Sequence, residues 1–538
     1  MKLYDHIVVG SGCSGAMAAQ TLLEGGAEVM MLDAGMTNPA FKDLIPNKSY
    51  GVIRQTEQEQ YQYFIGNNAD GVVWSDIGKG AQITPPRAHM VRGVDSLIPL
   101  QSSTFSPVES LGYGGLGISW GLQCWQYSTQ DMQAAGLDPT RMLAAYETVA
   151  ARIGISGTAD KASRYTLGNL QTYQPSPAMD RNHQRIYRNY QRHEARFNKH
   201  GFYLSRTPLA LITKNLHGRK GYQYRDMDYY SDNDASAWRP WITVNALRKN
   251  SRFTYIGGYL VTAFTEKRSH IEVHCLDIAA NTPAVFHCRK LVLASGALGS
   301  GRIALRSLQP HGKRLPLLCN PYSYIPCLQP AMMGKGLEPK KLGFAQLSLF
   351  LDAHADNFDV SVASLYSYQS LMLFRIIKQA PLNFVDARNI MRYLMSGIVI
   401  MGVHHPDAPG DGKYIELAKN RRSPTGDQLR AGYALSPEEQ ATYRQREKAF
   451  VACGRRLGLF PLAHINPGYG SSIHYAGTLP FSDDDTGMAL AKNGRLHGTK
   501  HVYVADSSGF NYLPARGLTF SLLANAHIVA EGVLRHGS

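Results

Sequence analysis

The chain begins with an apolar stretch that runs into closely spaced glycines, and this combination restricts the possible folds more than any other feature. The stretch reads Asp5-His6-Ile7-Val8-Val9-Gly10-Ser11-Gly12-Cys13-Ser14-Gly15 and continues into the helix-forming residues 16–23. We expect a buried strand, a tight turn and a helix. In such a turn the first glycine permits the bend, the second lets the backbone approach a pyrophosphate, and the third lets the helix pack closely on the strand.

A second apolar strand, over residues 28–32, ends in Asp33, which lies 18 residues after Gly15. An acidic residue at about this distance from the glycines often binds the ribose of a dinucleotide. The unpaired N–H groups at the helix N-terminus favour its phosphates. The order of strand, glycines, helix, strand and acid therefore predicts a dinucleotide site, and a βαβ unit without a ligand is the alternative.

Composition and cysteine usage indicate a folded protein of more than one domain. The 538 residues, 44% of them hydrophobic and 18% charged, are enough for about two to four domains. The seven cysteines are scattered and form no C-x-x-C pair, which predicts neither a disulfide framework nor a zinc site and favours a reducing, cytoplasmic compartment. The first apolar run is interpreted as a strand rather than a signal peptide, and no apolar run reaches the ~18–20 residues of a membrane span.

The chain is basic, with a net charge of +15 and a pI of about 9.3. The basic residues are dispersed along the sequence and no nucleic-acid-binding motif is recognised, so we expect no nucleic-acid partner. Residues 369–403 are apolar with interspersed Arg375, Lys378 and Arg392, and they are interpreted as two short helices joined at Pro381. Such a hairpin could make a peripheral membrane contact, or it could pack on its own domain or at a dimer contact.

Three later segments look suited to a ligand. The glycine-rich loop 111–121 favours close approach of the backbone to a flat ring. Residues 290–300 predict a strand that ends in small residues before a helix to Ser307, which again leaves backbone groups free for a nucleotide. A strand over 502–505 ends at Asp506, at the edge where α/β folds bind ligands, and a last helix follows Gly517.

The remaining pattern predicts further elements around these motifs. Residues 36–90 are expected to be loops with short helices, an excursion that flavoproteins often use to wrap an extended cofactor. We expect helices over 141–152, after Asp138-Pro139, and over 436–457, where Ser436 is an N-cap, and strands over 253–256, 260–265, 270–277, 284–288, 346–351 and 359–362.

With the C-terminal motif His474-Tyr475-Ala476-Gly477-Thr478, these features resemble the glucose–methanol–choline (GMC) flavoprotein oxidoreductases, and their pyranose-oxidase-type branch more than the choline or glucose type. The motifs occur in the family's order, whereas the segments between them carry no usable resemblance. The resemblance implies an α/β fold with a Rossmann-like FAD-binding domain built from residues 1–152, 246–312 and 464–538. A sheet-and-helix substrate domain would be built from 153–245 and 313–463.

The resemblance also implies where FAD binds. Gly10, Gly12, Gly15 and Asp33 would hold its ADP half, and Gly114, Gly115 and Ser119 would lie along the flavin. The other cofactor-binding residues predicted are Val261 and Ala294 at the adenine, Asp506 near the pyrophosphate or ribitol, and Cys13, Ser14, Gly517 and Thr519 at the starts of the two helices. No metal is expected.

His474 stands where the family places its catalytic base, which takes the proton of an alcohol while a hydride passes from carbon to the flavin N5. The pairing is chemically necessary because an alcohol C–H is a poor hydride donor until the O–H proton leaves, and imidazole is a base suited to neutral pH. The hydride chemistry belongs to the flavin. We therefore predict oxidation of a small-molecule alcohol, either a lipophilic alcohol or a sugar or secondary-metabolite hydroxyl, with oxygen or another electron acceptor.

Two positions depart from the family pattern. Ser119 stands where the pyranose-oxidase-type loop often has a histidine bonded to FAD, so we predict non-covalent FAD. Arg516, three residues before Thr519, stands where the family has a second catalytic His or Asn. A guanidinium cannot act as a base, but it can stabilise an alkoxide or anionic flavin or bind a carboxylate. Alternatively, Asn511 or Asn525 fills this role.

Arg516 also suggests an alternative function, and the remaining histidines near the motifs need an interpretation. Arg516 together with the apolar basic hairpin would also suit a flavin-dependent lyase or decarboxylase acting on a fatty-acid-like anion, which is the alternative function. His464 and the pair His404-His405 are expected to be packed or surface histidines.

Overall fold

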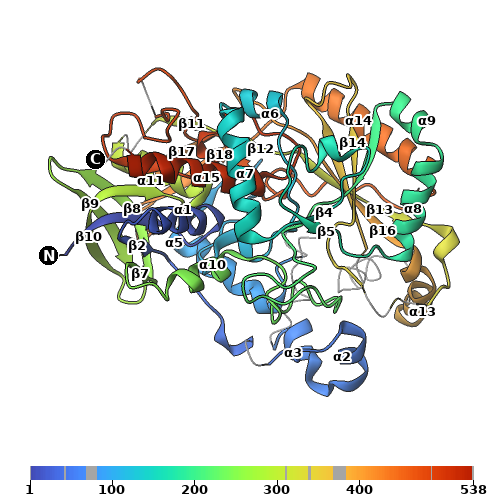
Figure 1. Ribbon diagram of the computed structural model, residues 1–538. Helices are drawn as coiled ribbons and strands as arrows, with labels where there is room; N and C mark the ends of the chain where they lie inside the picture. Colours follow the sequence, from blue (N-terminus) through green and yellow to red (C-terminus); the bar gives the residue numbers. More distant parts are fainter. Residues whose placement is uncertain are drawn as a thin grey trace.

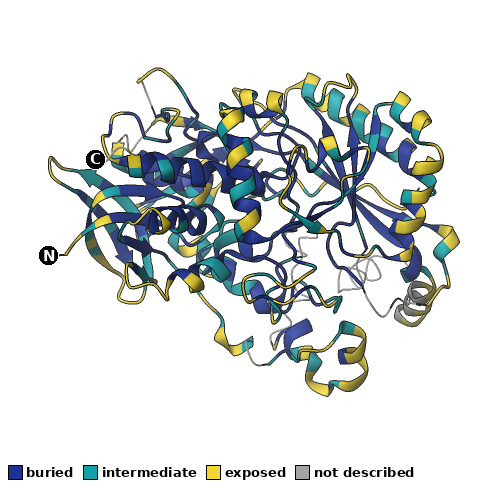
Figure 2. Ribbon diagram, in the orientation of Figure 1, coloured by how far each residue is buried: buried dark blue, intermediate teal, exposed yellow. Residues whose placement is uncertain are grey.

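The computed structural model describes residues 2–41, 44–67, 82–308, 312–336, 338, 341–367, 383–485 and 488–535. The chain forms two lobes, each built on a large sheet, with α7 (Pro139–Ile153) between them (Figure 1). The sheet of the second lobe is largely buried, whereas β8 (Tyr259–Glu266), β9 (Ile271–Asp277) and the first half of β10 (Thr282–Leu293) in the first lobe are partly exposed (Figure 2). The predicted α/β class is confirmed.

The first lobe contains a sheet of seven strands in the described part of the chain, in the order β7-β2-β1-β10-β9-β8, with β21 also paired to β10. β7, β2, β1, β10 and β21 run parallel, and β8 and β9 run antiparallel to their neighbours. The strands are β1 (Leu3–Val9), β2 (Val29–Leu32), β7 (Phe253–Ile256), β8 (Tyr259–Glu266), β9 (Ile271–Asp277), β10 (Thr282–Leu293) and β21 (Val502–Val504).

The two strands predicted over 284–288 and from 290 onward are a single strand, β10. Its first half pairs antiparallel with β9 and its second half pairs parallel with β1. The strand is therefore continuous across the change of partner, which a local pattern cannot reveal.

Helices cover this sheet and complete the expected strand–turn–helix unit. α1 (Cys13–Glu24) starts at the glycine turn and packs against α15 (Leu518–Arg535), which in turn packs against α7. α11 (Gly296–Leu308) follows β10 directly, and α10 (Pro240–Leu247) contacts α1. The predicted starts of α7 and α15 are confirmed, and the Asp138 side chain accepts a hydrogen bond from the backbone N–H of Thr140 at 2.9 Å as an N-cap.

The second lobe is built on an antiparallel sheet in the order β19-β13-β16-β15-β14-β6. Here the expectation for residues 369–403 is partly wrong, because residues 398–404 are not helical but form the interior strand β16. The β-branched run of Ile398, Val399 and Ile400 is buried between two neighbouring strands, which suits a sheet interior. The strands are β6 (Phe202–Arg206), β13 (Tyr322–Leu328), β14 (Leu347–Leu351), β15 (Ser361–Tyr366), β16 (Ile398–His404) and β19 (Phe460–Pro461).

The other part of that hairpin is described only from residue 383. α13 (Phe384–Leu394) is a helix, as expected for the second half, whereas residues 368–382 lie outside the described residues. No helix among the described residues is long and apolar enough to cross a membrane.

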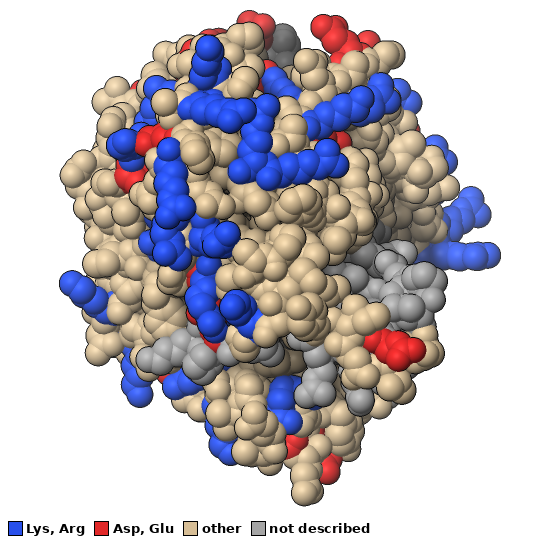
Figure 3. Space-filling view, turned by 90° about the vertical axis from the view of Figure 1, so that its right-hand side faces the viewer, with Lys and Arg blue, Asp and Glu red and all other residues tan. Residues whose placement is uncertain are grey.

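The outer side of the second lobe is covered by α8 (Arg181–Arg192), α9 (Glu194–Lys199) and α14 (Pro437–Arg456), whose apolar residues join the core of the sheet. The predicted α14 has a capping box between Ser436 and Glu439. Figure 3 shows that Lys and Arg far outnumber Asp and Glu on this face. In α8 the basic residues are not dispersed but share one exposed helical face, formed by Arg181, Arg185, Arg188 and Arg192.

Smaller elements connect the lobes. The expectation of short helices between residues 36 and 90 is confirmed for the described part. All seven cysteines carry free thiols. The remaining elements are β3 (Leu100–Gln101), β4 (Ser156–Gly157), β5 (Gln174–Pro175), β11 (Arg314–Pro316), β12 (Leu318–Cys319), β17 (Tyr414–Lys419), β18 (Asp427–Gly432), β20 (Tyr475–Ala476), α2 (Tyr50–Thr56), α3 (Tyr61–Phe64), α5 (Val94–Leu97), α6 (Thr129–Ala134), and the 3₁₀ turns η1 (Pro39–Phe41), η2 (Gln58–Gln60), η3 (Pro85–Val91), η4 (Gly115–Ile118), η5 (Ser163–Tyr165), η6 (Pro330–Met332), η7 (Met395–Gly397) and η8 (Ser507–Gly509).

Candidate active site

A cavity of about 390 Å³ extends from the first lobe to the second. At one end it is lined by residues that follow the parallel strands β1, β10 and β21, which is the edge where such sheets bind ligands. At the other end it is lined by Tyr322, Tyr366 and His404 from the antiparallel sheet. The two sheets thus contribute opposite ends of one site.

The glycine turn forms the wall of the first end. Gly10 has a φ of +97°, and a Cβ there would lie 2.9 Å from the Ala294 carbonyl oxygen. A Cβ on Gly15 would lie 1.8 Å from the Gly10 oxygen, so Gly15 is required by packing, as the sequence predicts. A Cβ on Gly12 would instead meet nothing within 4 Å. Gly12 is therefore the point where the backbone is open to the cavity, and α1 begins there without a side-chain cap.

Asp33 joins this turn to the glycine-rich loop. Its carboxylate accepts hydrogen bonds from the hydroxyls of Ser11 and, at 3.1 Å, Tyr255, and Ser11 Oγ in turn accepts the backbone N–H of Gly114 at 2.8 Å. Burial raises the pKa of Asp33 to about 6. Gly114 does not line the cavity. Its role is structural, because its N–H connects the glycine-rich loop to the glycine turn through Ser11.

Polar atoms without protein partners line the cavity where a polar ligand could bind them. The hydroxyls of Ser119 and Ser295 are buried without a hydrogen-bond partner among the described residues. Asp506 is held by Ser300 Oγ at 2.6 Å and by the backbone N–H of Ser508 at 3.0 Å, and burial raises its pKa. A buried polar atom without a partner is costly, so these hydroxyls, together with the open backbone at Gly12, fit a phosphate-bearing cofactor with polar ring atoms.

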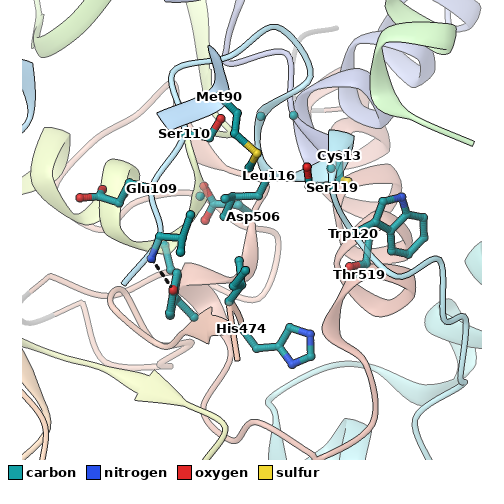
Figure 4. Close-up of a pocket in the computed structure, with 18 of the residues that line it drawn as sticks. Cys13, Met90, Glu109, Ser110, Leu116, Ser119, Trp120, His474, Asp506 and Thr519 are labelled. Atoms are coloured by element: carbon teal, nitrogen blue, oxygen red, sulfur yellow. Dashed lines mark hydrogen bonds between the residues drawn. The ribbon is translucent and has the colours of Figure 1, made fainter. Parts of the chain in front are cut away.

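His474 lies toward the other end of the cavity, at the opposite end of the labelled group from Met90 and Ser110 (Figure 4). It immediately precedes β20, and the residue before it, Ile473, has a φ of +61°. The left-handed region is unfavourable for a β-branched residue, by about 1–2 kcal/mol. Such strain is commonly kept at functional sites.

The protonation state of His474 follows from its partner. His474 Nδ1 and Asn320 Oδ1 are 3.0 Å apart, and the Asn320 amide nitrogen donates to the carbonyl oxygens of His405 at 2.8 Å and Pro514 at 3.1 Å. These donations fix the amide, so its oxygen can only accept, and Nδ1 must carry the proton. Nε2 therefore has a free lone pair. Burial lowers the pKa of His474 to about 4, so the ring is neutral at pH 7.

Most of the predicted residues are brought together in this cavity. Gly15, Gly114 and Arg516 are the predicted residues that do not line it. Those that line it are Gly10, Gly12, Cys13, Ser14, Asp33, Gly115, Ser119, Val261, Ala294, His474, Asp506, Gly517 and Thr519.

The expectation of a catalytic role for Arg516 is not supported by its position. Its guanidinium is fully buried and forms an ion pair with Asp131 and a hydrogen bond with Asn357, so it does not line the cavity. The two alternatives also lie elsewhere. The side chain of Asn511 donates to the Phe481 carbonyl oxygen at 3.0 Å, and that of Asn525 donates to the Asp506 carbonyl oxygen at 3.4 Å.

Sequence reasoning missed two residues near His474. Asn320 carries no motif, and no signal in the sequence connects it to His474. His404 was expected to be a packed or surface histidine, yet it lines the cavity, whereas His464 lies at the surface 3.2 Å from Glu447. Among the described residues, no group of three or more His, Cys, Asp or Glu side chains could hold a metal ion.

Comparison with known proteins identifies the class of this cavity. Residues 419–526, which include His474, match the family model of the GMC oxidoreductases. This C-terminal part of the chain is therefore similar to the GMC oxidoreductases. The match confirms the predicted resemblance to this flavoprotein family and the predicted enzyme class, an alcohol oxidoreductase.

Two curated proteins are similar to this chain over nearly its whole length. Paromamine 6'-oxidase of Streptomyces fradiae is 22% identical over 98% of this chain and 90% of its own length. The 6'''-hydroxyparomomycin C oxidase of Streptomyces lividus is 25% identical over 99% of this chain and 92% of its own length. Among solved structures, pyridoxine 4-oxidase from Mesorbium loti has the same fold, with a TM-score of 0.58, 13% identity and 98% coverage of both chains.

Proposed function

We propose that this chain is a GMC oxidoreductase that converts the CH–OH group of a small-molecule alcohol into a carbonyl, with His474 as the base. The observation that carries the proposal is the hydrogen bond from His474 to Asn320, because it leaves a free Nε2 lone pair on a neutral ring in the cavity. A base must be unprotonated and within reach of the hydroxyl before the C–H hydride can leave. When bound, FAD supplies the hydride acceptor.

The residues around the glycine turn would hold FAD. Gly12 and the N-terminus of α1 offer backbone N–H groups to the pyrophosphate, and Asp33 offers carboxylate oxygens to the adenosine ribose. The unpaired hydroxyl of Ser119 offers a hydrogen bond but forms no covalent link, which supports non-covalent binding. Acid precipitation followed by filtration tests this: the yellow cofactor should appear in the filtrate, and flavin that stays with the protein would contradict the proposal.

The substrate end of the cavity supports a ring-bearing polar alcohol. Tyr322, Tyr324 and Tyr366 line it, and the hydroxyls of Tyr322 and Tyr366 are 3.4 Å apart. Tyrosine rings offer apolar faces for stacking and hydroxyls for hydrogen bonds. The names of the relatives, which are oxidases of paromamine, a hydroxyparomomycin and pyridoxine, point to the same kind of substrate. Arg516, which suggested the alternative function on a fatty-acid-like anion, is paired with Asp131 and does not line the cavity, so it does not support that function.

Anaerobic stopped-flow measurement of flavin bleaching tests the proposal. The FAD-loaded enzyme is mixed with methyl glucoside, paromamine, pyridoxine and benzyl alcohol, and at least one should reduce the flavin. His474→Asn should slow that reduction about 100-fold or more, the usual contribution of a general base. His464→Asn, the same change at a surface histidine, is the matched control and should reduce at the wild-type rate. Equal rates for His474→Asn and wild type would exclude His474 as the base.

A further inference from the structure

Strand β16 ends at His404, and His405 follows it directly, but the two histidines have different surroundings. Residues that follow each other in a strand point to opposite faces, and His405 points into the protein. Its Nδ1 is 2.8 Å from Ser361 Oγ, and its ring stacks on Tyr443 at 4.6 Å between centroids. His404 instead lines the cavity. His405 is thus held by protein groups on its own side of the sheet, whereas His404 is available to a ligand.

The ring of His404 lies beside the ring of His474. Their centroids are 5.3 Å apart and their planes differ by 25°, and the Tyr322 ring also packs on His404, at 4.5 Å between centroids. Neither ring nitrogen of His404 has a hydrogen-bond partner among the described residues, and Nδ1 is buried. Packing therefore fixes the ring in place, while its hydrogen-bonding capacity stays unused.

Two neutral imidazoles next to each other can divide the work on one hydroxyl. Burial lowers the pKa of His404 well below its ordinary value, and the neighbouring His474 and His405 lower it further. A neutral imidazole has one N–H donor and one acceptor nitrogen. Each hydrogen bond from a ring nitrogen to an oxygen spans about 3 Å, so two nitrogens that share one oxygen can be up to about 6 Å apart. The rings of His404 and His474, with centroids 5.3 Å apart, can therefore reach the same oxygen.

We propose that His404 is a second catalytic residue, which donates an N–H to the oxygen of the reacting alcohol while His474 accepts the proton of that oxygen. This inference rests on the proposed function. The O–H proton would move to His474 Nε2 and His404 would keep its proton, while bound FAD would supply the acceptor for the C–H hydride, so that the carbonyl forms. A donor aimed at the oxygen stabilises the negative charge that develops there. His404 would thus supply, from the other lobe, the group that Arg516 does not supply.

Three variants of the FAD-loaded enzyme test this assignment with the alcohol that reduces the wild type fastest among methyl glucoside, paromamine, pyridoxine and benzyl alcohol. His404→Phe keeps a packed ring without a donor, and His404→Gln and His404→Asn keep an amide N–H. We expect His404→Phe to lower the limiting rate constant of flavin reduction about 100-fold, as the loss of one such donor does, with little change in the alcohol concentration that gives half the limiting rate. One of the amide variants should recover at least tenfold of this loss.

The possible outcomes separate the two proposals. FAD content and the rate of reduction by dithionite show whether each variant is folded, and the amide variants serve if His404→Phe is not. A wild-type limiting rate in His404→Phe, or a change only in the half-saturating concentration, would overturn the role of His404 and leave that of His474 intact. An equal loss in all three folded variants would make His404 a packing residue and also overturn its role. If no alcohol reduces the wild-type flavin, both proposals are refuted.

Discussion

His474 should remain neutral far into the acidic range, and this prediction can be tested without knowing the substrate. Burial lowers its pKa from the ordinary 6.5 to about 4, which corresponds to about 3 kcal/mol in favour of the neutral ring. At about pH 5.5, roughly 3% of the rings would then be protonated, compared with roughly 90% for an exposed histidine. The perturbation is therefore a simple change of buffer from about pH 7.5 to about pH 5.5.

The assay is NMR of the FAD-loaded enzyme with ¹⁵N-labelled histidine, using His474→Asn to assign the signal by its absence. We expect the pattern of a ring protonated at Nδ1, because Asn320 accepts that proton, and no shift of the signal down to about pH 5.5. A His474 signal that titrates near pH 6.5, or one protonated at Nε2, would refute the assignment of the base.

The same pKa has a consequence for stability, with a definite sign. The unfolded chain binds a proton at this histidine near pH 6.5, whereas the folded chain does so only near pH 4. The free energy of unfolding therefore falls as the pH drops between these values, because the unfolded state binds more protons. His474→Asn removes this contribution, so its stability should decline less steeply on acidification than that of the wild type.

Three further predictions concern the cofactor turn and the buried ion pair. Gly12→Ala should leave the melting temperature of the apoprotein unchanged but weaken FAD binding about tenfold or more in a fluorescence titration. Gly15→Ala should instead destabilise the apoprotein itself, because its Cβ would lie 1.8 Å from a carbonyl oxygen. Equal behaviour of the two variants would contradict the roles assigned to these two glycines. Asp33→Asn should weaken FAD binding by about tenfold, measured in the same titration, since a donor replaces an acceptor at the ribose; an unchanged affinity would place the ribose elsewhere. Arg516→Met should lower the free energy of unfolding in urea by about 3–5 kcal/mol, because it leaves the carboxylate of Asp131 buried and unpaired. Adding Asp131→Asn should restore part of this free energy. An Arg516→Met variant as stable as the wild type would show that the pair is dispensable.

The parts of the site that could be predicted from the sequence are those whose geometry is local. The glycine turn, the strand that ends at Asp33 and the strand that precedes Asp506 each follow from a short pattern that specifies strand, turn and helix. Because each of these patterns includes the residue that follows a parallel strand, the edge of the sheet where the cavity lies was predictable too.

The residues that escaped prediction depend on contacts between distant parts of the chain. Asn320 is 154 positions from the histidine whose proton it fixes. Asp131 is 385 positions from Arg516 and holds it away from the cavity, so a residue in the expected family position has a structural role instead. The strand β16 was mistaken for part of a helical hairpin because a short apolar run looks alike in a buried strand and a buried helix. His404 could not be assigned before this strand was placed.

The parallel sheet of the first lobe also has a consequence for how the chain is made. His6 pairs with Lys290, and Leu293 pairs with Val504, so the sheet joins residues from the two ends of the sequence. At a synthesis rate of ~5–20 residues per second, the first strand waits about 25–100 s for the last one to leave the ribosome. During synthesis the second lobe can assemble while the first lobe still has an open edge at β10. Arrival of the last strand and helix closes that edge and completes the cofactor site, so FAD should be captured only by chains that are already complete.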